Sequence, residues 1–188
     1  MIESMYSDIF VQWASKVGFT LSLKDDEVWV LADLGGEIRF CLHFAHEIYT
    51  LTQAQRAESE RFVMSGRNIT DIERYLTMGF GFSLRSMKKL PFIFLNGRPG
   101  PATIEDAALG YQIQQLSPGR ISLADSNSIR VVFFGNVPCE VRDAVEFSWI
   151  ADATLEDLCA SYLNPDGLPL FPGCTMRRTH VSVDKTGG

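Results

Sequence analysis

The chain has 188 residues, of which 46% are hydrophobic and 21% are charged, and this length suits one domain. The composition excludes a disordered chain, a collagen-like repeat and a small disulfide-dense scaffold. Lysine and arginine number 17 against 23 aspartates and glutamates, giving a formal charge of −6. This charge argues against nucleic acid as the partner, since nucleic-acid binders carry a basic excess or a basic stripe.

The N-terminal part of the chain has the pattern of a helix followed by an antiparallel meander. Residues 5–17 carry apolar side chains every three or four positions, which predicts a helix that ends at Gly18. The period then changes to two, and the expected strands cover residues 19–23, 27–31, 37–44 and 47–51. Gly35 and Gly36 predict a tight hairpin turn, because glycine adopts the positive φ angles that such turns require.

The strongest helix signal lies near the middle of the chain. Thr70 and Glu73 have the spacing of a capping box, in which each side chain accepts a hydrogen bond from the other residue's free backbone N–H. The apolar spacing that follows predicts a helix to about Phe80. Asp71, Glu73 and Arg74 are expected to point away from its apolar face.

A loop rich in glycine and proline predicts a lobe boundary near residues 96–102. Beyond it, the expected strands cover residues 111–116, 120–123, 129–134, 141–150 and 179–183. A further helix is expected over residues 154–162. The prediction is a single domain over residues 1–188 with an α+β fold, mainly antiparallel sheet in two lobes, with about three packed helices.

The sequence predicts a soluble cytoplasmic protein that does not bind a membrane. The N-terminus lacks the basic start and apolar core of a signal peptide, and no stretch approaches the ~20 apolar residues of a membrane span. The cysteines are scattered and form no Cys-x-x-Cys pair: Cys41, Cys139, Cys159 and Cys174. Such cysteines are expected to be buried free thiols in a reducing compartment.

His43 and His46, followed by Glu47, form the one cluster that suggests a metal site. In a strand these two histidines project to opposite faces, so we expect sheet or turn residues and no metal. The sequence contains no P-loop and no Gly-x-Ser-x-Gly elbow, and its acidic pairs fall in turns or at helix starts. We therefore expect no catalytic residues and no cofactor.

Three short segments resemble the central signature of a known family. Residues 72–76 (IERYL), 84–86 (LRS) and 90–91 (LP) are similar to the immunity-factor family that neutralises tuberculosis necrotizing toxin and related toxins. The chain also resembles this family at three further places, which are residues 13–14, Gly18 and residues 110–111. The shared motif is a helix followed by an arginine-containing turn, and we expect Arg85 to anchor the helix end through a carboxylate or a carbonyl.

The resemblance implies a cytoplasmic antitoxin without catalysis of its own. Members of that family bind a secreted NAD-glycohydrolase toxin and block its NAD-binding cleft, so the expected partner is a cognate toxin domain in a one-to-one complex. A cleft that attracts the phosphates of NAD favours an acidic inhibitor surface. Asp25, Asp26 and Glu27 at a predicted hairpin tip are the expected contact set, and Arg98 in the loop over residues 97–101 is a second candidate.

Two other functions remain open on the sequence alone. One is a small-molecule-binding or enzymatic α+β domain, which a deep pocket with a perturbed carboxylate or cysteine would favour. The other is a structural adaptor without a ligand.

Overall fold

The computed structural model describes residues 5–24, 28–95, 101–127, 130–135 and 139–176. Its main feature is one antiparallel sheet of eight strands in the order β1-β2-β3-β4-β5-β9-β8-β7. These strands are β1 (Phe19–Lys24), β2 (Val28–Asp33), β3 (Ile38–Ala45), β4 (Ile48–Gln55), β5 (Arg61–Gly66), β7 (Tyr111–Ser117), β8 (Arg120–Asp125) and β9 (Val131–Phe134). The predicted α+β class with a mainly antiparallel sheet is confirmed.

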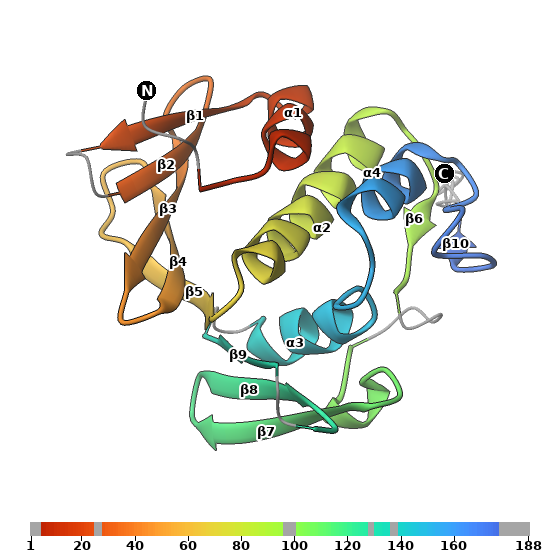
Figure 1. Cartoon of the computed structure of the whole chain (residues 1–188). Helices are drawn as coiled ribbons and strands as arrows, with labels where there is room; N and C mark the ends of the chain where they lie inside the picture. The colour runs from red at the N-terminus through yellow and green to blue at the C-terminus, as the bar shows by residue number, and fades with distance from the viewer. Residues whose placement is uncertain (1–4, 25–27, 96–100, 128–129, 136–138, 177–188) are drawn as a thin grey trace, which may run out of the picture.

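The two predicted strand blocks belong to one continuous sheet. They are joined where β5 pairs with β9, through Met64 opposite Phe134 and Ser65 opposite Phe133. In Figure 1 the first five strands stand on the left and β9, β8 and β7 lie at the bottom, with α2, α3 and α4 in the angle between them. The sheet therefore bends around its helices instead of separating into independent lobes.

Four α-helices accompany the sheet: α1 (Asp8–Lys16), α2 (Ile69–Met87), α3 (Glu140–Ser148) and α4 (Leu155–Leu163). The minor elements are a 3-10 turn, η1 (Ile104–Asp106), and a two-stranded sheet of β6 (Phe92–Ile93) and β10 (Thr175–Met176). The helices predicted over residues 5–17 and 154–162 are confirmed as α1 and α4. The strand predicted over residues 179–183 and positions 96–100 of the predicted lobe boundary lie outside the described residues.

The strand predicted over residues 141–150 is wrong, because this segment forms α3. Val141, Val145, Phe147 and Trp149 stand at odd positions and imitate a period of two. The buried residues of the segment instead include neighbours three and four positions apart, which is the spacing of one helix face: Ala144, Phe147, Ser148 and Ala151. Packing of this face on β7, β8 and β9 decides in favour of the helix.

Helix α2 begins and ends elsewhere than the sequence predicted. Its N-cap is Asn68, whose side chain accepts a hydrogen bond from the Thr70 backbone N–H at 3.0 Å. Thr70 is therefore inside the helix, and the Glu73 carboxylate instead accepts from the Ser7 backbone N–H. The helix also continues past Phe80 to Met87, so the predicted capping box and C-terminal end are both wrong.

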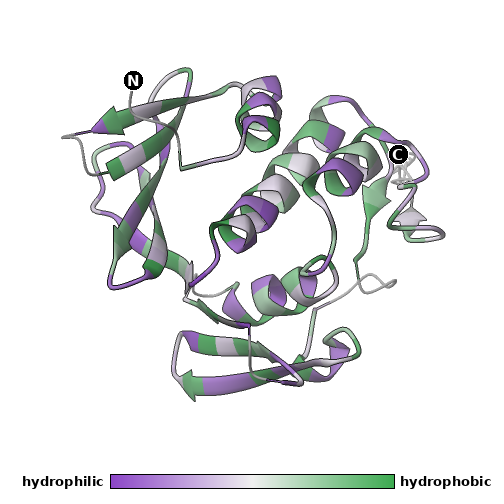
Figure 2. Cartoon of the chain, viewed as in Figure 1, coloured by the Kyte–Doolittle hydropathy of each residue, from purple (hydrophilic) through white to green (hydrophobic). Residues whose placement is uncertain are grey.

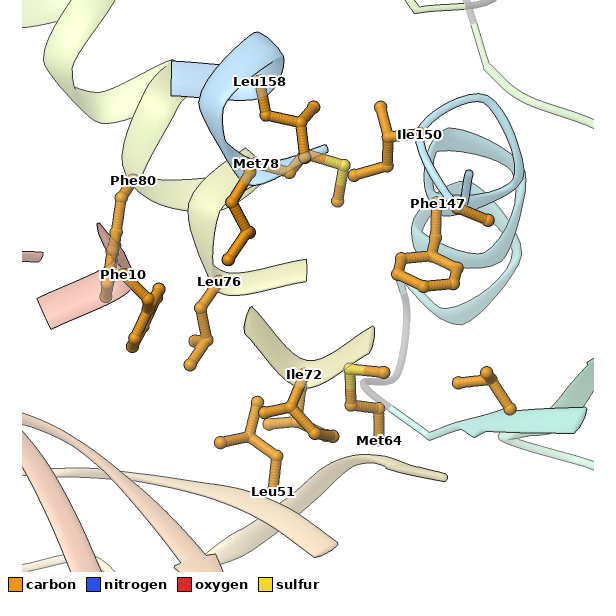
Figure 3. Close-up of a cluster of buried hydrophobic side chains, with 14 of the residues drawn as sticks. Phe10, Leu51, Met64, Ile72, Leu76, Met78, Phe80, Phe147, Ile150 and Leu158 are labelled. Carbon is orange, nitrogen blue, oxygen red and sulfur yellow. The ribbon is translucent and has the colours of Figure 1, made fainter. Parts of the chain in front are cut away.

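The hydrophobic core surrounds α2. Ile72 of α2 lies beside Leu51 of the sheet, and Phe80, two turns further on, lies beside Phe10 of α1 (Figure 3). All four side chains are at most 4% exposed. Hydrophobic and hydrophilic residues alternate along the outer strands and along the helices (Figure 2), as expected for elements that bury one face. Helix α2 thus packs on the first half of the sheet, and its Tyr75 ring also contacts Phe134 of β9.

Candidate functional site

The predicted toxin-contact residues, Asp25, Asp26, Glu27 and Arg98, lie outside the described residues. The ends of β1 and β2 that flank the first three are described. Lys24 and Val28 pair with one another at these ends. The contact role of the three acidic residues and of Arg98 therefore stays a prediction.

The two predicted strand or turn histidines lie in different settings. His43 is in β3, and its Nε2 atom lies 2.9 Å from Oε2 of Glu60. His46 is in the turn after β3, with a φ of 52°. Within the part of the chain that the structure describes, no group of three or more histidine, cysteine or acidic side chains could hold a metal ion.

Arg85 donates to carbonyl oxygens, as the sequence predicted, but it lies inside α2 and not in a turn after it, and the helix end that it anchors is that of α4. Its guanidinium is 2% exposed and donates to the backbone oxygen of Pro91 at 2.7 Å. It also donates to backbone oxygens at and just beyond the end of α4: Ser161, Tyr162, Asn164 and Pro165. The last carbonyls of a helix have no partner within the helix, so one arginine satisfies groups that would otherwise be buried without hydrogen bonds.

A buried ionic cluster ties α2 to the second half of the sheet. Asp71 is 1% exposed, and its Oδ1 atom lies 3.0 Å from Nη1 of Arg74 and 3.4 Å from Nε of Arg130. Arg130 also contacts Asp152 at 2.7 Å and the Tyr111 hydroxyl at 2.9 Å. The sequence placed Asp71 outside the apolar face of the helix, but the structure buries it because neighbours cover that side of α2 too.

A cavity of about 340 Å³ lies between α2, α3 and the first half of the sheet. This volume falls at the lower end of the range of small-ligand pockets, about 300–1,000 Å³. Three phenylalanine rings line one part of it, Phe19 of β1, Phe40 of β3 and Phe80 of α2. Their centroids are 4.6 to 5.9 Å apart, so they form one aromatic surface. We call this space the α2–α3 cavity.

Helix α3 supplies the charged part of the α2–α3 cavity through Arg142, Asp143 and Glu146. Asp143 is 5% exposed and accepts a hydrogen bond from the Tyr75 hydroxyl at 2.8 Å. The Arg142 side chain is 57% exposed, and its Nη2 atom lies 3.7 Å from Oδ1 of Asp143. Two of the three charged groups therefore have a partner in the protein.

The Glu146 carboxylate has no hydrogen bond or ion pair with any of the described residues. The pKa of Glu146 is raised to about 7, mainly by burial; Arg142 lowers it and Asp143 raises it, and both effects are included in that value. An acid that is buried without a partner is costly, because its charged form loses hydration without compensation. Glu146 is thus the one acid of this cavity whose partner is not supplied by the described part of the chain.

Sequence reasoning missed Glu146 and Arg142 because it assigned their segment to a strand. Arg142 and Glu146 stand four positions apart, which places two residues on one face of a helix and also on one face of a strand, so their spacing alone does not reveal the helix. The signal that could have found them is the spacing of Ala144, Phe147, Ser148 and Ala151, which repeats at three and four residues. The cavity itself has no sequence signal, since its walls come from six separate elements.

Replacing Glu146 by glutamine is expected to change how stability depends on pH. The pKa of Glu146 is raised from 4.5 to about 7 on folding, so the folded state binds the proton more tightly. This contribution to stability is complete below pH 4.5 and is lost as the pH rises through 7. From pH 5 to pH 8 we expect the wild-type protein to lose about 2 kcal/mol more of its unfolding free energy than Glu146→Gln.

Urea unfolding at a series of pH values measures this difference. Glu58→Gln, at an exposed glutamate in the turn between β4 and β5, is the matched control and should follow the wild-type curve. Parallel curves for the wild type and Glu146→Gln would contradict the assignment of a partly buried carboxylate without a partner among the described residues.

Comparison with protein families gives a match to the model described as Immunity protein 61, over residues 13–170. This chain belongs to the Immunity protein 61 family. The matched region runs from α1 to a point after α4, so the family includes the whole eight-stranded sheet and the helices within its bend. The α2–α3 cavity and the Arg85 anchor therefore both lie inside the Immunity protein 61 region.

Individual relatives agree with the Immunity protein 61 assignment. The chain is 28% identical over 145 residues to the immunity factor for TNT of Mycobacterium tuberculosis and, equally, to its homolog in Mycobacterium bovis. These alignments cover 76% of this chain and 77% of each relative. The solved structure of Rv3902c from M. tuberculosis is similar with a TM-score of 0.75 and 26% identity, covering 92% of this chain and 97% of that one. The predicted resemblance to immunity factors is confirmed.

Two further predictions concern the cysteines and the membrane. All four cysteines of this Immunity protein 61 member are free; Cys41 is buried, and the other three are partly exposed. Burial raises the pKa of Cys41 and of Cys159 to about 11, so both thiols stay protonated at neutral pH. Among the helices of the described residues, none is long and apolar enough to cross a membrane.

Proposed function

We propose that this protein is a non-catalytic antitoxin of the cytoplasm that binds a cognate NAD-glycohydrolase toxin one-to-one and covers its NAD-binding cleft. The observation that carries the proposal is the similarity to the immunity factor for TNT, which extends over 76% of the chain. Agreement of the fold with Rv3902c over 92% of the chain supports the same assignment. Binding to the toxin's active site is the step that goes beyond the family assignment.

Charge supports an inhibitor that covers a phosphate-binding cleft. Such a cleft must attract the two phosphates of NAD, and an acidic surface complements it. The chain carries a formal charge of −6 and places Asp25, Asp26 and Glu27 in succession between β1 and β2. We propose these three residues as the main contact set and Arg98 as part of a second one.

The test is NAD hydrolysis by a glycohydrolase toxin of the necrotizing-toxin type, ideally one encoded beside this gene, measured with and without this protein. Inhibition that is complete at one equivalent, together with a one-to-one complex on size-exclusion chromatography, is the expected result. A complex without inhibition would reject the proposal that this protein covers the NAD-binding cleft, but it would support the toxin as the binding partner. Absence of both would reject the proposed function.

Reversing the charge at Asp25 and Asp26 is expected to weaken the complex about tenfold or more and to reduce its dependence on salt. Replacing both by lysine changes the formal charge from −6 to −2, since each substitution adds two charges. The matched control is Glu47→Lys with Glu58→Lys, which makes the same change of charge at exposed turns. Equal affinities of the two double variants would show that total charge matters and the hairpin does not.

A further inference from the structure

We propose that the α2–α3 cavity is a binding site for an organic cation, an ammonium or guanidinium group carried on an apolar stem. The cavity offers the two surfaces that such a group requires. The rings of Phe19, Phe40 and Phe80 provide an aromatic wall for the stem and for cation–π contact. Glu146 provides a carboxylate for the charge.

The absence of a partner for Glu146 among the described residues is the observation that selects a cation. Asp143 in the same cavity is bonded to Tyr75, and Arg142 lies beside Asp143. Glu146 thus remains as a partly buried acceptor whose best complement is a positively charged donor from outside. Ser83 of α2 and Gln53 of β4 also line the cavity and can accept further hydrogen bonds from an ammonium or guanidinium group.

Gly79 is an exposed residue that also lines the cavity. It lies within α2, where glycine is about 1 kcal/mol less favourable than alanine. Packing does not demand glycine here, because a Cβ atom at this position would meet no other atom within 4 Å. Since Gly79 lines the cavity, a residue without a side chain leaves the space beside it free for an occupant.

Titration with 2-phenylethylamine tests the site, because this probe joins an aromatic ring to a primary ammonium. Its neutral counterpart is 2-phenylethanol, which has the same shape and no charge. Two-dimensional amide NMR spectra of the full chain should show saturable shifts at Gly79 and Ser83 with the amine. We expect Glu146→Gln to weaken amine binding about tenfold or more and to leave alcohol binding unchanged. Glu58→Gln is the matched control and should bind the amine like the wild type.

The pH dependence of amine binding is a separate check. The pKa of Glu146 in the free protein is about 7, and the charged groups that act on it are Arg142 and Asp143. Tyr162, on the neighbouring α4, also interacts electrostatically with Glu146, and its pKa is raised well above its usual value. Tyr162 therefore stays neutral, and the ionised fraction of Glu146 rises about tenfold between pH 6 and pH 8. Amine binding should tighten by about the same factor.

The cation can be a free ligand or a lysine or arginine side chain of the toxin, and a second arm distinguishes the two. Only this second experiment, which measures toxin inhibition, rests on the proposed function. If the toxin supplies the cation, Glu146→Gln weakens toxin inhibition and 2-phenylethylamine competes with the toxin. If the cation is free, toxin inhibition is unchanged. Equal binding of amine and alcohol, or equal amine binding by the wild type and Glu146→Gln, would overturn the proposed site whatever the toxin assay shows.

Discussion

Replacing Arg85 by methionine is expected to lower the free energy of unfolding by about 3–5 kcal/mol. Methionine retains an apolar stem of similar length but removes every donor. The carbonyl oxygens at the end of α4, among them those of Tyr162 and Asn164, then stay buried without their charged donor. Each buried carbonyl left without a partner costs about 1–3 kcal/mol. The positive charge at the C-terminal end of α4 is also lost, which removes a favourable interaction with the helix dipole.

Urea unfolding followed by circular dichroism measures this effect, and two variants make it specific. Arg67→Met, at an exposed position before α2, should change stability by less than about 0.5 kcal/mol. Arg85→Lys retains a charge but cannot reproduce the fork of donors, so we expect a loss between those of the wild type and Arg85→Met. A loss below about 1 kcal/mol for Arg85→Met would contradict the anchoring role.

Adding one methyl group at two neighbouring glycines of α2 is expected to have opposite effects. A Cβ atom on Gly81 would lie 2.3 Å from Cγ of Tyr162, far inside van der Waals contact. Tyr162 is fully buried, and its ring packs against Phe82 and Phe171 with centroids 5.5 and 5.6 Å away, so it has no room to move. Gly81→Ala must therefore push α4 away from α2, and we expect a loss of about 2 kcal/mol or more.

Gly79→Ala is the matched comparison, because it makes the same change in the same helix. A Cβ atom there meets no atom within 4 Å, so only the helix preference for alanine remains. We expect a gain of up to about 1 kcal/mol in the free energy of unfolding. Denaturant unfolding of the two single variants measures both changes in the free energy of unfolding. Effects of the same sign would show that close approach of α4 does not explain the glycine at position 81.

The stability of the Arg85 and Gly81 contacts bears on the proposed cation site in the α2–α3 cavity. Both contacts hold α4 against α2, and α2 carries one wall of the α2–α3 cavity. Variants that separate these helices should therefore disturb amine binding as well as stability, whereas Glu146→Gln should disturb only amine binding and the pH dependence of stability. This difference separates a folding defect from loss of the site itself.

The resemblance to immunity factors could be recognised in the sequence because its motif serves local structure. Residues 72–76 make up more than one full turn of α2, and Arg85 stands four turns into that helix, where it reaches the end of α4. Residues that are needed to form one helix lie close together in the chain, so they can be recognised as a short sequence motif. The contact set at Asp25, Asp26 and Glu27 has no comparable pattern, since charge complementarity depends on a partner and not on the fold.

The sequence by itself determined the alternating strands of the meander and the helices α1 and α4. These features follow from local periodicity, capping and side-chain chemistry, which act within a few residues. The tertiary structure alone decided that β5 pairs with β9, that residues 140–148 form a helix, and that Glu146 lies unpaired among the described residues beside an aromatic wall. Each of these depends on contacts between residues far apart in the chain, where packing energy outweighs local preference.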